Sequence, residues 1–276
     1  MAGIHDAPVF HCGDPAVVRR FCQRYGIDAH APRMTVIERV SQAFSSLPYE
    51  NLTKIIKSDG VVGPRSAMRL PDEVLADHLR WGTGGTCFSL TAAVIAVYNA
   101  LGIEAYPLLA DRHYGIDTHC GLVVMHERRM LLVDPGYLLF IPPPFPTTAA
   151  VSVALGYTTI ELRPLQGGQR IELATIVKGS RKVRLTYKRT IVDAETFVRA
   201  WIDSFTWEMM TYPVLTRCAA GEHLYLQGGA LSVRTAEKTI RSRLGVKEQL
   251  DFIRNTMGIS RDIIAQAWGV ITHGTA

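Results

Sequence analysis

The most informative stretch of the sequence is Trp81-Gly82-Thr83-Gly84-Gly85-Thr86-Cys87-Phe88-Ser89-Leu90. Its glycines end one predicted helix, and a second, apolar helix is predicted from about Cys87 to Leu101, with Gly102 as its stop. A cysteine in the first turn of a helix faces unpaired backbone N–H groups and the positive end of the helix dipole. Both favour thiolate over thiol, and the thiolate is the nucleophile. The same N–H groups are suited to hold a developing oxyanion.

The residues before this stretch predict helices. One helix follows Asp14, a plausible N-cap, and a second extends from Ile37 to Leu47, where Pro48 ends it. A third begins at Pro71, because proline suits the first turn of a helix. The N-terminal hundred residues therefore predict a helical bundle that leads to Cys87.

After Gly102 the hydrophobic period changes to that of strands. The final third is mixed: a short helix over 196–205, a hairpin of two strands over 223–226 and 230–234, and two terminal helices over 247–257 and 260–268. Helices, then strands, then a mixture favour an α+β fold over a wound parallel sheet. The predicted central strands are Ala105–Ala110, Cys120–Met125, Met130–Asp134, Tyr157–Arg163, Ile171–Val177 and Lys182–Lys188.

A cysteine nucleophile needs a base, and the base needs a group that orients it. His119 stands at the start of one predicted strand, and Asp134 stands at the end of the next. If these strands pair antiparallel, the two side chains lie side by side, and one imidazole nitrogen is left for Cys87. The order Cys87, His119, Asp134 predicts an acyl-transfer triad based on a thiol.

Four segments together resemble the arylamine N-acetyltransferases, relatives of the transglutaminase and papain-like cysteine enzymes. The resemblance extends from about Leu47 to the C-terminal helices, where the hairpin from Leu224 to Thr235 is similar to the family's third domain. The four segments are Leu47-Pro48-Tyr49-Glu50-Asn51-Leu52, Gly84-Gly85-Thr86-Cys87-Phe88, Thr118-His119 and Val133-Asp134-Pro135-Gly136-Tyr137.

This resemblance implies an N-terminal helical bundle, a central β-barrel-like domain and a C-terminal α/β lid around a cysteine-protease or transglutaminase-like core. We expect the boundaries at 1–102 for the domain that carries the cysteine, 103–190 for the domain that carries His119 and Asp134, and 191–276 for the lid. The implied reaction is ping-pong transfer of an acyl group from a thioester, such as acetyl-CoA, to a small-molecule amine. The candidate binding residues are Gly84, Gly85, Phe88, Gly136 and Tyr137.

Three positions depart from the family's pattern. The family usually has an arginine where this chain has Thr83, and a glutamate where it has Ser89. It usually has a glycine at the position of Leu138, in a loop near the coenzyme A phosphates. Acyl transfer is therefore better supported than acetyl-CoA as the donor or an arylamine as the acceptor.

Three alternatives stay open beside an ordinary N-acyltransferase. An amide synthase would release a chain from an acyl carrier protein and would not require the coenzyme loop. A binding protein would keep the fold without catalysis. A thiol hydrolase would use the same triad with water as acceptor, because the lid's exclusion of water decides between transfer and hydrolysis.

Composition sets the broad class. The chain has 276 residues, of which 47% are hydrophobic and 20% charged, and its formal net charge is +5. These values are typical of a globular protein and argue against disorder. The charge excess is able to steer a phosphate-bearing carrier, but without an arginine-rich block we expect no nucleic-acid partner. No apolar run approaches the ~20 residues that span a bilayer, so no membrane association is expected.

Five scattered cysteines do not form a disulfide framework, and the first six residues lack the pattern of a signal peptide. We therefore expect a cytoplasmic protein with reduced thiols. Cys120 is expected to face away from His119 and to be structural, as are Cys12, Cys22 and Cys218. His113, Asp117, His119 and Cys120 lack the paired spacing of a zinc site. We expect no metal and no tightly bound cofactor.

Overall fold

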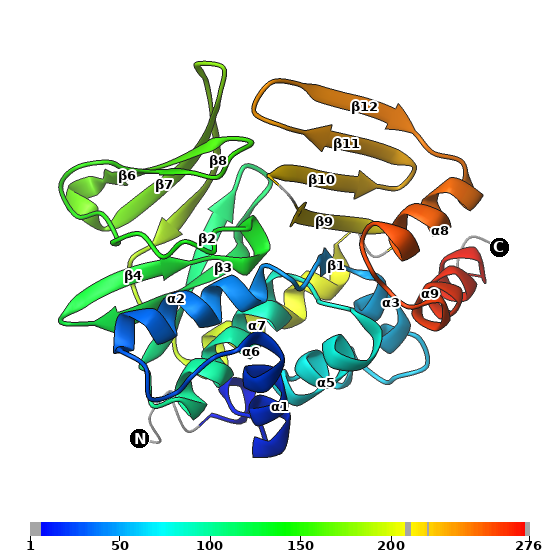
Figure 1. Cartoon of the computed structure of the whole chain (residues 1–276), viewed down its shortest axis with the longest axis horizontal. Helices are drawn as coiled ribbons and strands as arrows, with labels where there is room; N and C mark the ends of the chain where they lie inside the picture. The colour runs from blue at the N-terminus through cyan, green and yellow to red at the C-terminus, as the bar shows by residue number, and fades with distance from the viewer. Residues whose placement is uncertain (1–6, 208–210, 220, 274–276) are drawn as a thin grey trace.

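The computed structural model describes residues 7–207, 211–219 and 221–273 (Figure 1). The first six residues, where no signal peptide was predicted, lie outside the described residues. In Figure 1 the N-terminal helices lie at the bottom, and two sheets stand side by side above them. The structure thus combines helices and sheets, as the order of the sequence patterns predicted.

The N-terminal part is helical, as expected. Asp14 caps the first helix by accepting a hydrogen bond from the Ala16 N–H, and Pro71 opens the helix that Gly82 ends. Gly82 has φ +70°, and a Cβ there would lie 2.2 Å from the Gly258 oxygen. The elements are η2 (Pro8–Phe10), α1 (Pro15–Tyr25), α2 (Arg33–Phe44), α3 (Leu52–Ser58), α4 (Pro64–Ala67), α5 (Pro71–Trp81) and α6 (Cys87–Ala100).

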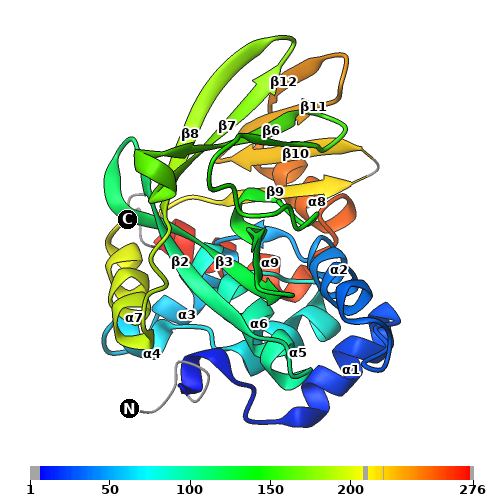
Figure 2. The ribbon, with the colours of Figure 1, turned by 90° about the vertical axis from the view of Figure 1, so that its left-hand side faces the viewer.

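The central part is a curled sheet of seven antiparallel strands in the order β4-β3-β2-β8-β7-β6-β5. Helix α6 packs against β2 and β3, while β6 to β8 turn away from the helices (Figure 2). The strands are β2 (Ala105–Arg112), β3 (Gly115–His126), β4 (Arg129–Val133), β5 (Val151–Ala154), β6 (Thr159–Leu165), β7 (Arg170–Val177) and β8 (Ser180–Lys188). The short 3₁₀ helix η3 (Pro135–Tyr137) follows β4, and η4 (Gln166–Gly168) joins β6 to β7.

A second, five-stranded sheet joins the N-terminal helical part of the chain to its C-terminal part. Its order is β1-β9-β10-β11-β12, and β1 comes from the helical part. The members are β1 (Tyr49–Glu50), β9 (Val214–Ala219), β10 (Glu222–Gln227), β11 (Ala230–Arg234) and β12 (Thr239–Arg243). Helices α8 (Val246–Asn255) and α9 (Arg261–His273) follow this sheet, and α9 packs on α3.

The buried hydrophobic side chains form three clusters. The first lies among the N-terminal helices and one face of β2 to β4, the second lies inside the curled sheet, and the third lies between the five-stranded sheet and α8 and α9. Helix α7 (Ala194–Asp203), which precedes η5 (Ser204–Thr206), buries Phe197 and Trp201 in the first cluster. The boundaries after residues 102 and 190 stay a prediction, because α7 packs in the cluster of the N-terminal helices and β1 pairs with β9 of the C-terminal part.

Some elements lacked a sequence signal. Strand β12 has five exposed residues and therefore no alternation of apolar and polar side chains. The four-residue β5 and the two-residue β1 are too short for a period to appear. Among the described residues, no helix combines the length and apolar character needed to cross a membrane.

Candidate active site

Cys87 is the first residue of α6, and its side chain is buried at 3% exposure. Thr86 precedes it in extended backbone conformation at the N-cap position. The helix is buried on almost every face because it lies between the N-terminal helices and the curled sheet. The N–H groups of its first turn have no acceptor within the helix and are directed towards the Cys87 end.

His119 and Asp134 lie side by side, as the sequence predicted for an antiparallel pairing of β3 with β4. The His119 Nε2 lies 2.6 Å from the Asp134 Oδ2, and both side chains are buried. The Arg112 Nη2 donates to the His119 Nδ1 at 3.2 Å. Because a guanidinium only donates, Nδ1 accepts, and the proton of the neutral ring lies on Nε2, facing Asp134.

The Asp134 carboxylate is held by further donors. Its Oδ1 accepts from the Tyr137 N–H at 2.8 Å, and its Oδ2 accepts from the Tyr187 hydroxyl. Tyr187 is on β8, two strands away from β3 in the sheet order. The carboxylate is therefore held beside the imidazole by donors from η3 and from β8.

The surroundings of Cys87 favour its thiolate. A hydrogen bond from the Cys120 thiol is the main cause that holds the pKa of Cys87 well below its ordinary value, against burial, which raises it. A hydrogen bond with His119, its charge and that of Arg112 act in the same direction. Burial lowers the pKa of His119, but the Asp134 carboxylate outweighs this, and the pKa lies above its ordinary value. The thiol and the imidazole thus lie together in surroundings suited to a nucleophile and a base.

Two residues beside this group had no assigned role in the sequence. Cys120, expected to be structural, hydrogen-bonds to Cys87, and its sulfur lies 3.5 Å from the Thr91 Oγ1, one turn along α6. Arg112 ends β2 and reaches His119. Strand alternation placed Cys120 on the face opposite His119, and it carries no information about Arg112, which lies on the neighbouring strand β2.

Gly84 and Gly85, the two glycines before Cys87, stand where a larger side chain would clash with its neighbours. A Cβ at Gly84 would lie 1.8 Å from the Pro48 oxygen, and a Cβ at Gly85 would lie 2.3 Å from the Ser89 Oγ. The Gly85 N–H donates to the Pro48 oxygen at 3.3 Å, and its carbonyl accepts from the Glu50 N–H at 3.0 Å. These contacts hold the segment before Cys87 against the edge of β1.

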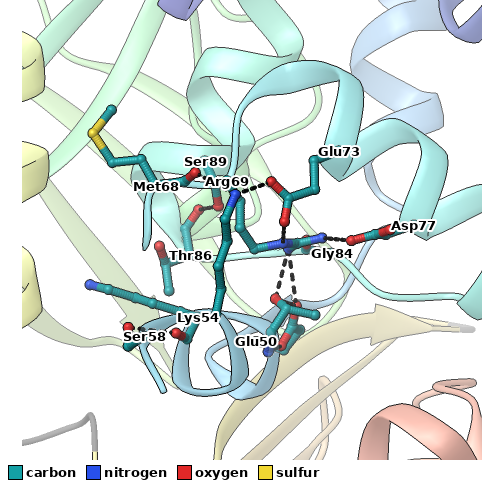
Figure 3. Close-up of polar contacts among 12 residues, drawn as sticks. Glu50, Lys54, Ser58, Met68, Arg69, Glu73, Asp77, Gly84, Thr86 and Ser89 are labelled. Carbon is teal, nitrogen blue, oxygen red and sulfur yellow. Dashed lines mark hydrogen bonds and ion pairs between the residues drawn. The ribbon is translucent and has the colours of Figure 1, made fainter. Parts of the chain in front are cut away.

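Arg69 occupies the region where the sequence departs from the family's pattern (Figure 3). Its Nη1 donates to the Gly84 oxygen at 2.6 Å and lies 3.7 Å from the Glu50 Oε1. Its Nη2 donates to the Asp77 Oδ2 at 2.7 Å. Thr83 and Ser89 thus lack the usual charges, but an arginine from the loop before α5 supplies a buried cation beside the glycines.

Glu50 and Asn51 stand at the start of α3, and their side chains make buried hydrogen bonds there. The Glu50 carboxylate accepts from the Thr53 N–H at 2.9 Å and from the Thr53 Oγ1 at 2.5 Å. The Asn51 side chain donates to the Tyr212 oxygen at 2.8 Å and accepts from the Val214 N–H at 2.8 Å. Asn51 therefore joins the start of α3 to the start of β9.

Leu138 keeps the backbone geometry that a glycine would favour. It has φ +60°, a left-handed conformation that is unusual for a branched side chain. Its side chain is buried at 5% exposure. The turn after Asp134 is therefore left-handed at Leu138, although this residue is not a glycine.

A cavity of about 360 Å³ is lined by residues of both sheets, and Cys87, His119 and Asp134 are not among the described residues that line it. Gly136 and Tyr137, two of the predicted binding residues, line it. A Cβ on Gly136 would lie 2.7 Å from the Cys87 Cβ and 3.0 Å from the His119 Cε1, so this glycine brings the cavity wall against both side chains. Phe88 instead packs among Phe197, Trp201 and Trp207.

The binding roles of Gly84, Gly85 and Phe88 stay predictions, since none of the three is among the residues that line this cavity. Of the residues that the structure describes, no three His, Cys, Asp or Glu side chains gather as metal ligands. His113 contacts Tyr114 edge-on and is exposed.

The fold resembles several solved structures of arylamine N-acetyltransferases. The enzyme from Nocardia farcinica superposes with a TM-score of 0.77 and 18% identity over 97% of this chain and 99% of its own. The enzyme from Mycobacterium abscessus gives a TM-score of 0.76 and 19% identity over 92% and 94%. The Mycobacterium marinum enzyme in complex with CoA gives 0.75 and 19% over 92% and 98%.

No family model and no curated protein matches the sequence. The structural likeness nevertheless covers nearly the whole chain, and it defines the class: this is a protein with the arylamine N-acetyltransferase fold. The resemblance read from the four sequence segments is thereby confirmed at the level of the fold.

Proposed function

We propose that this protein is a cysteine-dependent N-acyltransferase of the arylamine N-acetyltransferase family. It would move an acyl group from a thioester, such as acetyl-CoA, to a small amine. The observation that carries the proposal is the hydrogen-bonded chain from Cys87 through His119 to Asp134 at the N-terminus of α6. The CoA complex of the similar M. marinum enzyme supports an acyl-CoA donor.

In the first half-reaction, the Cys87 thiolate attacks the carbonyl carbon of the donor thioester. The negative charge that develops on the carbonyl oxygen is stabilised by N–H groups of the first turn of α6. The bond between the carbonyl carbon and the donor sulfur then breaks. His119 gives the proton that it took from Cys87 to the departing thiolate, which leaves as a free thiol.

In the second half-reaction, the amine nitrogen attacks the carbonyl carbon of acyl-Cys87. His119 accepts the proton that the nitrogen loses, and Cys87 leaves as a thiolate while the amide departs. Throughout, Asp134 accepts the Nε2–H of His119, which leaves Nδ1 to take the proton; the Arg112 N–H that Nδ1 accepts in this structure must turn away when it does so. Tyr187 and the Tyr137 N–H keep the carboxylate in place.

The proposal is tested by the initial rates of amide formation with both substrates varied. A Cys87 acyl-enzyme predicts parallel double-reciprocal lines, because the donor thiol leaves before the amine reacts. Intersecting lines would contradict it. The rate at which the donor thiol is released in the absence of an amine measures hydrolysis. In a separate comparison, acetyl-CoA, longer acyl-CoAs and an acyl-loaded carrier protein are offered as donors. Turnover with the carrier alone would make the enzyme an amide synthase.

A further inference from the structure

The guanidinium of Arg112 lies against His119 and carries a donor that no neighbour uses. Arg112 is the last residue of β2, where it lines the cavity together with Gly136 and Tyr137. Its Nη2 donates to the His119 Nδ1 and its Nη1 donates to the Tyr114 hydroxyl, both at 3.2 Å. Its Nε is buried and has no hydrogen-bond partner among the described residues. Buried N–H groups are normally satisfied, so this donor is unused in the resting site.

The groups that act most strongly on the charge of Arg112 are hydroxyls and a thiol, not carboxylates. They are those of Tyr114, Tyr49 and Cys87, and no Asp or Glu is among the described residues that line the cavity. The rings of Tyr114 and Tyr137 lie 6.0 Å and 5.9 Å from the guanidinium carbon, within the range of cation–π contacts. Since a guanidinium keeps its proton at every physiological pH, Arg112 is a permanent charge available to a negative charge formed nearby.

The contact between Arg112 and His119 is possible only before proton transfer. In the resting site Nδ1 accepts from Arg112 while Nε2 donates to Asp134. Once Nδ1 has taken the Cys87 proton it is a donor, and it no longer accepts from the guanidinium. Arg112 therefore has to leave Nδ1 in the same step in which negative charge forms at Cys87. The distance is short, because Gly136 lines the cavity with Arg112 and a Cβ on it would lie 2.7 Å from the Cys87 Cβ.

The charge of Arg112 acts on both partners of this proton transfer. Burial, and also Arg112, lower the pKa of His119, against the Asp134 carboxylate, which raises it. The hydrogen bond from Cys120 is the main cause that lowers the pKa of Cys87, and the charge of Arg112 adds to it. Arg112 thus favours the thiolate, and it makes the imidazolium a stronger acid towards the departing donor sulfur.

Four tyrosines also interact with the charge of Arg112, and they stay neutral near neutral pH because burial raises the pKa of each. They are Tyr49 on β1, Tyr137 on η3, Tyr187 on β8 and Tyr225 on β10. Lys54 on α3 is a second cation that interacts with Cys87, and burial lowers its pKa to about 7. Because Lys54 is the same in every variant compared below, differences among their pH profiles report the substituted arginine.

We propose that Arg112 is a catalytic residue of the acyl transfer: it holds the His119 Nδ1 as an acceptor at rest and turns to the negative charge at Cys87 and the thioester oxygen when Nδ1 takes the proton. In this step a sulfur electron pair of Cys87 bonds to the carbonyl carbon. The C=O pair moves to the oxygen, to which Arg112 donates beside the N–H groups of α6. When this pair returns, the bond to the donor sulfur breaks and Nδ1 gives its proton to that sulfur. The proposal rests on the proposed function and adds a residue to it.

The first experiment measures single-turnover acylation of Cys87 by acetyl-CoA with intact-protein mass spectrometry over a range of pH. Arg112→Gln should lower the rate on its pH plateau by roughly a hundredfold, as the loss of one oxyanion donor does. Arg112→Lys keeps a positive charge without the planar fork and should recover part of this loss. Arg184→Gln is the matched control. Arg184 lines the same cavity but donates to the Thr175 Oγ1, so its loss should change the plateau far less.

The second experiment needs no acyl donor. Alkylation of Cys87 by the neutral reagent iodoacetamide follows its thiolate, so the pH at which alkylation sets in reports the pKa of the thiol. Removal of the cation in Arg112→Gln should shift this profile to higher pH, and Arg112→Lys should restore most of it. Arg184→Gln should shift it less. A merely structural role of Arg112 would lower the urea midpoint without moving the profile.

A normal acylation plateau in folded Arg112→Gln would overturn the catalytic role, even with a shifted alkylation profile, and so would equal effects of Arg184→Gln. If Arg112→Gln does not fold, Arg112→Lys decides in its place, since a plateau equal to that of the unmodified protein would overturn the proposal. Absence of acylation of the unmodified protein by every donor would refute the acyl transfer itself. The alkylation profile would then still show whether Arg112 controls the Cys87 thiol.

Discussion

Replacing Arg69 by methionine tests the buried network of Figure 3. The arginine side chain is 3% exposed and Glu50 is 0% exposed, so the substitution leaves a buried carboxylate without its cation. Breaking such a pair costs about 3–5 kcal/mol of folding free energy. Glu50 keeps its two hydrogen bonds from Thr53, which places the expected loss near the lower end, about 3 kcal/mol. Asp77 and Glu73 retain contact with water and add little.

The assay is urea unfolding followed by tryptophan fluorescence and circular dichroism. Glu50→Gln combined with Arg69→Met should recover part of the loss, because it removes the orphaned charge. Arg20→Met is the control, since Arg20 is 57% exposed and its pair with Asp14 spans 3.8 Å; we expect a change within about 0.5 kcal/mol. A loss below about 1 kcal/mol for Arg69→Met, or strictly additive effects in the double variant, would refute the reasoning.

The same substitution should slow the chemistry. Arg69 donates to the Gly84 oxygen, three residues before Cys87. Without this bond the segment that precedes α6 loses a fixed point, and small displacements of a nucleophile are costly. We expect acylation of Cys87 to slow by roughly tenfold or more at a temperature where the variant is folded. A folded variant that acylates at the normal rate would limit Arg69 to a stabilising role.

Three further predictions follow from the site. Asp134→Asn should lower kcat by roughly a hundredfold or more, because His119 loses its orienting carboxylate; steady-state rates and urea midpoints check this. Cys120→Ala should raise the pKa of Cys87, so that alkylation by iodoacetamide shifts to higher pH. Burial lowers the pKa of Lys54 to about 7 from the ordinary 10.5, so the unfolded chain binds more protons between these values. Stability should therefore rise with pH across this window, and Lys54→Met should flatten the rise.

Each of these has a contrary result. An Asp134→Asn protein that loses stability but keeps its specific activity would make the carboxylate structural. An unchanged alkylation profile in Cys120→Ala, with Cys22→Ala as its control, would remove Cys120 from the control of the nucleophile. Equal pH dependence of unfolding in Lys54→Met and the unmodified protein would mean that the Lys54 ammonium is not desolvated as its burial against Phe205 indicates.

The sequence predicted the core of the site because local rules determine it. Helix signals located Cys87 at a helix start, and a two-residue turn at Glu127 and Arg128, both with positive φ, joins the strands that bring His119 to Asp134. The departures at Thr83, Ser89 and Leu138 left acyl transfer better supported than a particular donor or acceptor. Arg69 was not anticipated as a replacement at the first two, because its contact with Gly84 depends on how the loop before α5 packs.

The cavity could not be predicted in the same way. Arg112, Arg184 and Arg234 lie on three strands of two sheets, and no spacing in the sequence relates them. Arg112 is the last residue of the apolar strand β2, and an arginine at such a position usually lies at the protein surface. Their convergence depends on the curl of one sheet and on the pairing of β1 with β9 in the other. These are long-range contacts, and hydrophobic periodicity does not encode them.

The most direct test of the central claim is intact-protein mass spectrometry after incubation with acetyl-CoA and without an amine. We predict a gain of one acetyl group that maps to Cys87, disappears in Cys87→Ala, persists in Cys22→Ala and is discharged when an arylamine is added. An acetyl group that persists in Cys87→Ala, or amide formation by that variant at the normal rate, would contradict a Cys87 acyl-enzyme.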